Sequence, residues 1–224
     1  MNDIIEYSNS KEERKFVQKG IDVEIETFGE ILSECENIPY IGSLYKVGKV
    51  FADFRDLHFV KRLAKFLSKS ESISYEVKSK FIDSLSSKER KRISDFLMNS
   101  LYNCEEDIKA EILGYVYKYR LLGSFSEGEA NTHVENDYMF RICHGINLVY
   151  AWNLQYLCEY REEHTNDGIS TDDLYHAGFL SMRISGTNSI PFTPQTLYQL
   201  NVYGSKLDDI LYKENWYEKS QSGV

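Results

Sequence analysis

Apolar residues recur at three- and four-residue steps along most of this chain, and that spacing limits the folds open to it. The pattern is clear between Lys11 and Cys35 and again between Gly42 and Leu67. Such a period places apolar side chains on one face of an α-helix, whereas a half-buried strand would alternate. Only 3 of the 224 residues are proline, a residue that interrupts helices. The spacing therefore predicts a mainly α-helical chain.

Start and stop signals divide this pattern into separate helices. Pro39 ends the first helix, because the residue before a proline is driven out of the α region. Ser86, Ser87 and Glu89 form a start signal, since a serine can cap free N–H groups and a glutamate can reach back to it. We expect helices at residues 11–35, 42–67, 74–85, 87–102, 105–122 and 138–163.

The pattern changes after Glu163. A turn at residues 165–168 leads to a short helix at 171–177, and two alternating runs at 179–184 and 196–200 predict a β-hairpin with a long tip. A final helix is expected at residues 205–214. We therefore predict a mainly α protein, with a multi-helix bundle at residues 1–163 and a small α+β segment at residues 164–224.

The motifs of this last segment resemble the C-terminal half of winged-helix domains. They are Leu174-x-x-Ala-Gly-Phe-Leu, then the hairpin, then Leu197-Tyr-x-Leu-x-x-x-Gly-x-x-Leu. The resemblance implies DNA binding, with residues 171–177 as the recognition helix. From Ser170 onward, however, 4 basic residues stand against 6 acidic ones, so phosphates would be repelled. A wing that packs or contacts protein is the favoured interpretation.

Composition and cysteine usage point to a cytoplasmic location. No charge-free run approaches the roughly 18 to 20 apolar residues needed to span a bilayer, and the first fifteen residues lack a signal-peptide core. The four cysteines are widely scattered without a CxxC pair, which is typical of reduced thiols. They are Cys35, Cys104, Cys143 and Cys158.

Charge is distributed unevenly along the chain. The basic segment, residues 44–92, contains 13 Lys and Arg against 6 Asp and Glu, although the whole chain carries a net charge of -9. Such a split indicates either an anionic partner, nucleic acid or membrane, or compensation within the protein. The middle of this segment has lysines beside aromatic rings, the pattern of an interfacial helix, and a core helix with a lysine rim looks the same. Its candidate binding residues are Phe59, Lys61, Arg62, Lys65, Phe66 and Lys69.

Tyrosine is abundant, with 17 copies, and many fall in the central helices. Amphipathic rings with a hydroxyl suit partly wet interfaces, so some of them are expected to face a partner or a second subunit. Tyr115 and Tyr119 are the candidates. Ordinary packing at the boundary of the core explains them equally well.

No motif for catalysis, a cofactor or a metal is present. The sequence contains no HExxH, GxSxG or GKS/T, and its glycines do not form a phosphate loop. The nearest metal-ligand set centres on Cys143 and His144, which are adjacent on a helix and point about 100° apart. We therefore expect no catalytic residue, no cofactor and no metal, and a binding role rather than an enzymatic one; a dispersed active site stays open.

Four stretches carry a wider resemblance. They are Ile38-Pro-Tyr-Ile-Gly, residues 54–67, Ile108-Lys-Ala-Glu-Ile-Leu-Gly and residues 146–157. In this order they resemble a group of bacterial and prophage helical proteins found in mobile or anti-phage defence regions. The resemblance implies a role in phage–host conflict and supplies no catalytic residue.

Three functions follow as hypotheses. The first is a non-catalytic protein-binding module that self-associates or binds a protein partner, in a defence or counter-defence context. The second is a nucleic-acid-binding regulator that uses the basic segment. The third is a peripheral membrane effector built on residues 42–69.

Overall fold

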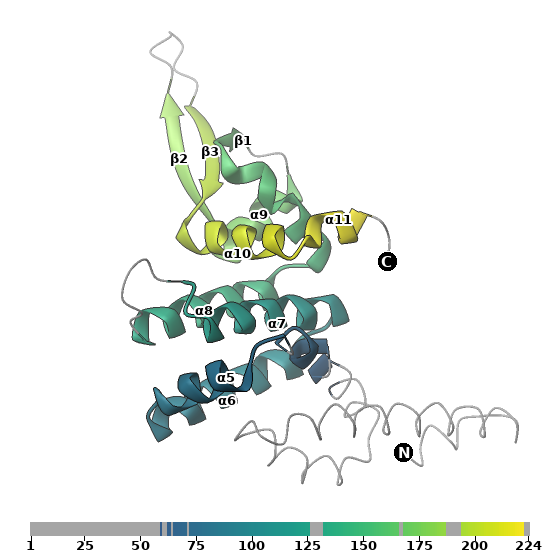
Figure 1. Cartoon of the computed structure of the whole chain (residues 1–224). Coiled ribbons are helices and arrows are strands. Elements are labelled where there is room, and N and C mark those ends of the chain that lie inside the picture. Colours follow the sequence, from purple (N-terminus) through teal and green to yellow (C-terminus); the bar gives the residue numbers. More distant parts are fainter. Residues whose placement is uncertain are drawn as a thin grey trace, which may run out of the picture.

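The computed structural model describes residues 59, 62–63, 65–70, 72–125, 132–165, 168–186 and 194–221. The helix expected at residues 11–35 lies outside these ranges, as does most of the helix expected at 42–67. Lys61 and Cys35 also lie outside them. Within the described ranges the protein is mainly helical, with a small antiparallel sheet near its C-terminal end (Figure 1).

The first described helices follow the expected boundaries closely. They are α5 (Tyr75–Asp83), α6 (Ser87–Tyr102) and α7 (Asp107–Leu121). The next helix, α8 (Thr132–Leu148), begins before residue 138, where a helix was expected to start. The predicted start signal of α6 is a complete capping box. The Ser86 side chain accepts the Glu89 backbone N–H, and the Glu89 carboxylate accepts the Ser86 N–H at 3.0 Å. The N-cap residues of α5 and α7 make no such side-chain bond, so the apolar period marks these two helices and the capping box adds a start signal for α6.

The prediction of one continuous helix at residues 138–163 is wrong. It is divided into α8 and a 3₁₀ helix, η1 (Ala151–Arg161). Tyr150 is extended, with φ -66° and ψ 140°, and the next N–H, of Ala151, donates to the Glu106 carboxylate at 3.0 Å. A side chain that is distant in sequence thus replaces the helical acceptor, which no local pattern reveals.

The predicted hairpin and the two helices beside it are confirmed. The elements after η1 are β1 (His164–Thr165), α9 (Ile169–His176), β2 (Leu180–Gly186), β3 (Pro194–Leu200), α10 (Val202–Lys213) and α11 (Trp216–Gln221). The sheet order is β1-β3-β2, and all pairs are antiparallel. Tyr198 of β3 pairs with Met182 on one side and with His164 on the other. Strand β1 and helix α11 were not predicted.

Asn201 and Gly204 join the sheet to α10. The Asn201 side chain accepts the N–H groups of Tyr203 and Gly204 and donates to the Gly178 carbonyl at 2.8 Å. A Cβ on Gly204 would lie 2.2 Å from the Phe179 carbonyl oxygen. Only glycine allows this close approach, so the start of α10 is held against the start of β2.

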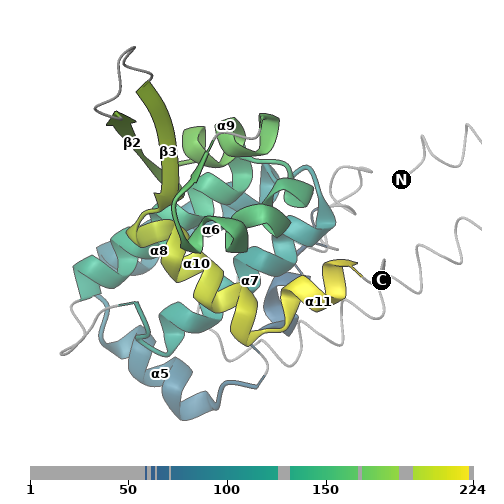
Figure 2. The same ribbon diagram turned by 90° about the horizontal axis from the view of Figure 1, so that it is seen from above.

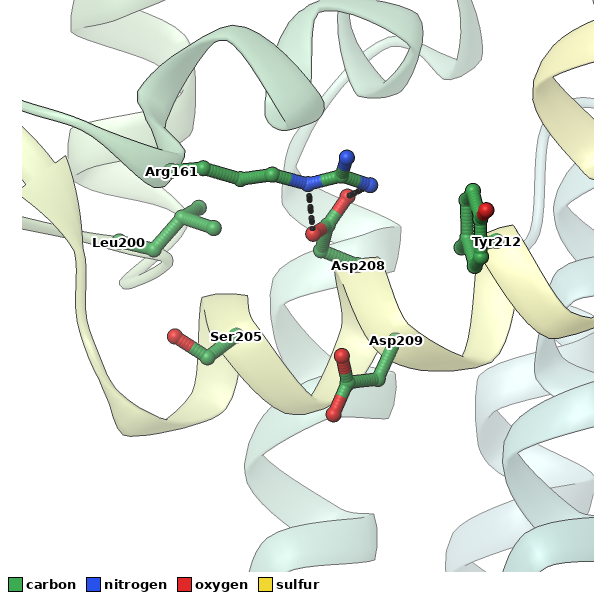
Figure 3. A pocket seen from close by; sticks show the side chains of 6 residues that line it. All are labelled: Arg161, Leu200, Ser205, Asp208, Asp209 and Tyr212. Carbon is green, nitrogen blue, oxygen red and sulfur yellow. Dashed lines mark hydrogen bonds and ion pairs between the residues drawn. The ribbon is translucent and has the colours of Figure 1, made fainter.

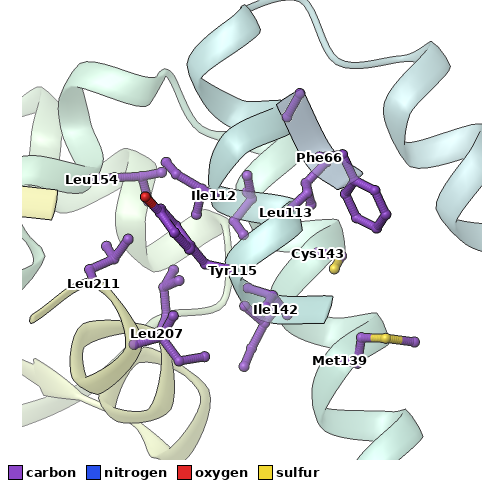
Figure 4. Packing of buried hydrophobic residues seen from close by; sticks show 14 of the residues in the cluster. Phe66, Ile112, Leu113, Tyr115, Met139, Ile142, Cys143, Leu154, Leu207 and Leu211 are labelled. Carbon is purple, nitrogen blue, oxygen red and sulfur yellow. The ribbon is translucent and has the colours of Figure 1, made fainter. Parts of the chain in front are cut away.

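One hydrophobic core holds these elements together. The four residues Ala110, Ile112, Leu113 and Val116 of α7 are fully buried, and α7 and α8 lie between α5 and α6 on one side and α10 on the other (Figure 1). Figure 2 shows α10 lying over α7 and α8, and Figure 4 shows residues of α7, α8 and α10 in one cluster. The core thus contains residues from both sides of the domain boundary expected after Glu163. None of the described helices is both long and apolar enough to cross a membrane.

Candidate functional site

The two candidate phenylalanines of the basic segment are buried. Phe59 is 7% exposed and Phe66 is 3% exposed. Phe66 stacks on Tyr117 of α7 with ring centroids 5.2 Å apart, and Phe59 lies 6.3 Å from the Tyr102 ring. Both rings pack against the helices that follow them in the sequence, which agrees with the core-helix interpretation of these two residues rather than the interfacial one.

The cations beside these rings face carboxylates of α7. Lys65 pairs with Asp107 at 3.2 Å, Arg62 lies 3.8 Å from the same side chain, and Lys69 pairs with Glu111. These pairs are partly exposed, so each contributes about 0 to 1 kcal/mol. Part of the basic segment is therefore compensated within the protein. An anionic partner would have to compete with these carboxylates for the same three cations.

The two candidate tyrosines pack against neighbouring helices. Tyr115 is 4% exposed, and its hydroxyl donates to Glu111 at 3.4 Å. Tyr119 is half-buried, and burial together with the charge of Glu214 raises its pKa to about 12. Lys118 pairs with that same Glu214, on α10's C-terminal side, at 2.8 Å. Both tyrosines thus occupy the boundary between α7 and its neighbours.

A first polar pocket, of about 370 Å³, lies between the end of η1 and α10 (Figure 3). Asp208 is 4% exposed and accepts two hydrogen bonds from Arg161, at 2.7 and 3.0 Å, and one from the Tyr217 hydroxyl at 2.6 Å. The Arg161 guanidinium also lies 5.4 Å from the Tyr212 ring. The residues that line this pocket are Arg161, Leu200, Ser205, Asp208, Asp209 and Tyr212.

The charged groups at the centre of this first pocket contact one another. Burial and the hydrogen bond to Asp208 raise the pKa of Tyr217 well above its usual range, so the hydroxyl stays a donor. The Arg161–Asp208 pair is bidentate, the strongest form of such a contact. This arrangement joins η1 to α10 and α11, and it explains the Arg161–Asp208–Tyr217 cluster as a structural contact.

A second polar pocket, of about 530 Å³, lies between the start of α6 and the first half of α8. It holds two cations of the basic segment, Lys88 and Arg92, together with His133, Asn136 and Phe140 of α8. The remaining lining residues are Ser86, Glu89, Ile93 and Asp137. The sequence marked Lys88 and Arg92 only as members of a charged run, because their α8 neighbours lie more than forty residues away.

An exposed aromatic patch lies where the ends of α6 and α8 meet. It comprises Tyr102, Leu148, Tyr150 and Trp152, each at least half exposed. Two contacts bring their segments together: the Asn147 side chain donates to the Ser100 carbonyl at 3.2 Å, and the Ala151 N–H donates to Glu106. Trp152 falls within the single helix expected at residues 138–163, so this aromatic patch was not predicted.

The cysteines and histidines in the described ranges do not gather around a metal position. No group of three His, Cys, Asp or Glu side chains there is placed to hold an ion. Cys143 is buried in the core, whereas its neighbour His144 is exposed. Burial raises the pKa of the Cys104, Cys143 and Cys158 thiols, so each is held in its neutral form.

Comparisons with protein families, with curated proteins and with solved structures found no match to this chain.

Proposed function

We propose that this protein is a non-catalytic binding module that engages a protein partner through the aromatic patch, with a second copy of the chain as the first partner to test. The observation that carries the proposal is that Tyr102, Leu148, Tyr150 and Trp152 are each at least half exposed, on segments that the Asn147–Ser100 and Ala151–Glu106 hydrogen bonds bring together. Monomeric proteins rarely leave contiguous large apolar side chains in water, and such patches mark interaction sites.

The residue types of the aromatic patch suit an interface. Tyrosine and tryptophan bury a large apolar area while their polar atoms still reach water or a partner. They are also the residues that most often contribute the binding energy at the centre of an interface. Trp152, 50% exposed, lies edge-on to Tyr156 at 6.2 Å, so its ring is held in place before a partner arrives.

The C-terminal segment is proposed to be winged-helix-like and to serve packing or protein contact. The sheet order β1-β3-β2, with α9 between β1 and β2, supports this arrangement. Thr171 and Leu174 of α9 are fully buried, and the Thr171 hydroxyl lies 2.7 Å from that of Tyr160. Because this face of α9 packs inward, it is not available to enter a DNA groove. Met182 and Ile184, two positions apart on β2, are exposed and offer apolar side chains for such a contact.

A defence or counter-defence context stays a prediction that rests on the sequence resemblance alone. The neighbouring genes test it directly, since a chain of this role is expected among mobile or anti-phage genes. Nucleic-acid and membrane binding through the basic segment also stay predictions.

Sedimentation equilibrium of the wild-type chain and of Tyr150→Ser and Trp152→Ser tests the proposed function. We expect self-association in the wild type, and we expect each substitution to weaken it by about 2 kcal/mol, roughly thirtyfold in Kd. Tyr212→Ser is the matched control, because Tyr212 is 67% exposed on α10, outside the patch. A strict monomer that also recovers no partner from extracts of its native host would contradict the proposal.

A further inference from the structure

Asn136 carries an amide group that the second pocket can use. The residue is 7% exposed, and its side-chain oxygen accepts the Arg120 Nε–H at 2.8 Å. A guanidinium has only donors, so the amide must turn its oxygen towards Arg120. Its NH₂ group is thereby left over, and within the described ranges no acceptor bonds to it. Asn136 thus offers a nearly buried, oriented donor to the pocket.

Arg92 and Lys88 add two positive charges to the same pocket. They stand four residues apart on α6, so they share one helix face. The Arg92 guanidinium lies 4.9 Å from the Phe140 ring, and Phe140 itself packs edge-on against Phe96 at 4.5 Å. This packing holds the guanidinium plane while its N–H groups stay open. Among the described residues, no carboxylate pairs with Lys88 or Arg92.

The two carboxylates of the pocket are already engaged by the protein. Glu89 accepts the N–H and the hydroxyl of Ser86 in the capping box, and these bonds lower its pKa. Asp137 pairs with Arg141 at 2.9 Å. The charged groups in and beside the pocket are therefore four cations and three carboxylates, without His133. The cations are Lys88, Arg92, Arg120 and Arg141, and the carboxylates are Glu89, Glu135 and Asp137.

We propose that this second pocket binds the phosphate group of a small molecule, with Asn136, Arg92 and Lys88 as donors to its oxygens. Phosphate presents several strong acceptors to such a set, and a guanidinium edge matches it in two-point contacts. The volume of about 530 Å³ is in the range of small-molecule sites. The half-buried Phe140 ring beside Arg92 gives an apolar wall for the rest of the ligand. This site is separate from the aromatic patch and independent of the proposed function.

Isothermal titration of the full chain with pyrophosphate tests the site. We expect one binding site per chain, weakened about tenfold or more by Arg92→Gln and by Asn136→Asp. Asn136→Asp keeps the oxygen that Arg120 needs but replaces the amide donor with a negative charge, so we expect the fold to be retained while pyrophosphate binding is weakened. Thermal melting of each variant verifies the fold.

Lys91→Gln is the matched control, because it removes the same charge from the exposed part of α6 without touching the pocket. Its affinity for pyrophosphate is expected to stay within about twofold of wild type. No pyrophosphate binding overturns the proposal. Equal weakening by Lys91→Gln and Arg92→Gln also overturns it, since that result describes attraction of pyrophosphate to the positive charge of α6 in general and not to the pocket.

A single-stranded DNA oligonucleotide is the second probe. If it binds more tightly than pyrophosphate and loses affinity with Arg92→Gln but not Lys91→Gln, the phosphate is that of a nucleic acid. If Lys91→Gln weakens it as much, the pocket is not its site.

Discussion

The two polar pockets of the described chain contain similar residue types but differ in what those residues contact. At the first pocket, Asp208 receives three hydrogen bonds from Arg161 and Tyr217, so its charge is matched within the protein. At the second, Lys88 and Arg92 face the pocket without a carboxylate partner among the described residues. The charged groups of the first pocket thus have hydrogen-bond partners within the protein, whereas Lys88 and Arg92 of the second pocket have N–H donors that a ligand can use.

This difference separates stability from binding. A buried carboxylate with its partners in place holds elements together, and removing one partner exposes the full cost of burying the other. Exposed cations without partners add little to folding and remain available to a ligand. We therefore expect substitutions at the first pocket to lower the free energy of unfolding, and substitutions at the second to leave it almost unchanged.

Asp208→Ala is expected to have the largest effect on stability. It removes three hydrogen bonds to a charged acceptor and leaves the Tyr217 hydroxyl without that partner. We expect a loss of about 2 to 3 kcal/mol in the free energy of unfolding, because Arg161 keeps access to water. Urea unfolding measures it. Asp209→Ala is the control on the same helix, exposed at the edge of the same pocket, and is expected to change stability by under about 0.5 kcal/mol.

Tyr217→Phe is expected to cost about 1.5 kcal/mol near neutral pH, because only one hydrogen bond to Asp208 is lost. The effect depends on pH. Burial and Asp208 raise the pKa of Tyr217 in the folded protein, so the hydroxyl stabilises the fold fully below about pH 10, where an unfolded tyrosine ionises. Above that pH the unfolded state releases the proton first, and the stability contribution declines. Urea unfolding of the wild type and of Tyr217→Phe between pH 8 and about 11 should show the difference in their free energies of unfolding becoming smaller as the pH rises. A difference that stays constant would contradict this prediction.

The sequence predicted what local chemistry decides. The helices α5, α6 and α7, the hairpin strands and α10 follow apolar period, capping residues and turn residues, all read within a few positions. The capping box of Ser86 and Glu89 is specified by two residues three apart. Such features can be assigned without knowing what packs on them.

The errors arise where distant residues meet. The break after α8 depends on Glu106 accepting the Ala151 N–H from forty-five residues away. Local sequence left Phe66 open as either a core or an interfacial residue, because its neighbour, Tyr117, stands on another helix. The candidate sites shifted for the same reason. Asp107 and Glu111 compensate the cations first selected, and Asn136 and Phe140 give Lys88 and Arg92 a pocket that a linear charge count does not show.

The smallest stability effect is expected for Lys88→Gln and Arg92→Gln. Neither side chain donates to a described carboxylate, and both are exposed, so Lys88→Gln should change the free energy of unfolding by under about 0.5 kcal/mol. Arg92→Gln also loses the contact with the Phe140 ring, so its effect should be under about 1 kcal/mol. A loss above about 1 kcal/mol for Lys88→Gln would show that its charge is needed for folding, and the contrast between the two pockets would fail. With pyrophosphate present the comparison becomes sharper. A ligand that binds only the folded state stabilises it more the tighter it binds, so one fixed concentration of pyrophosphate should raise the melting temperature of the wild type and of Asp209→Ala by the same amount, and that of Arg92→Gln by less.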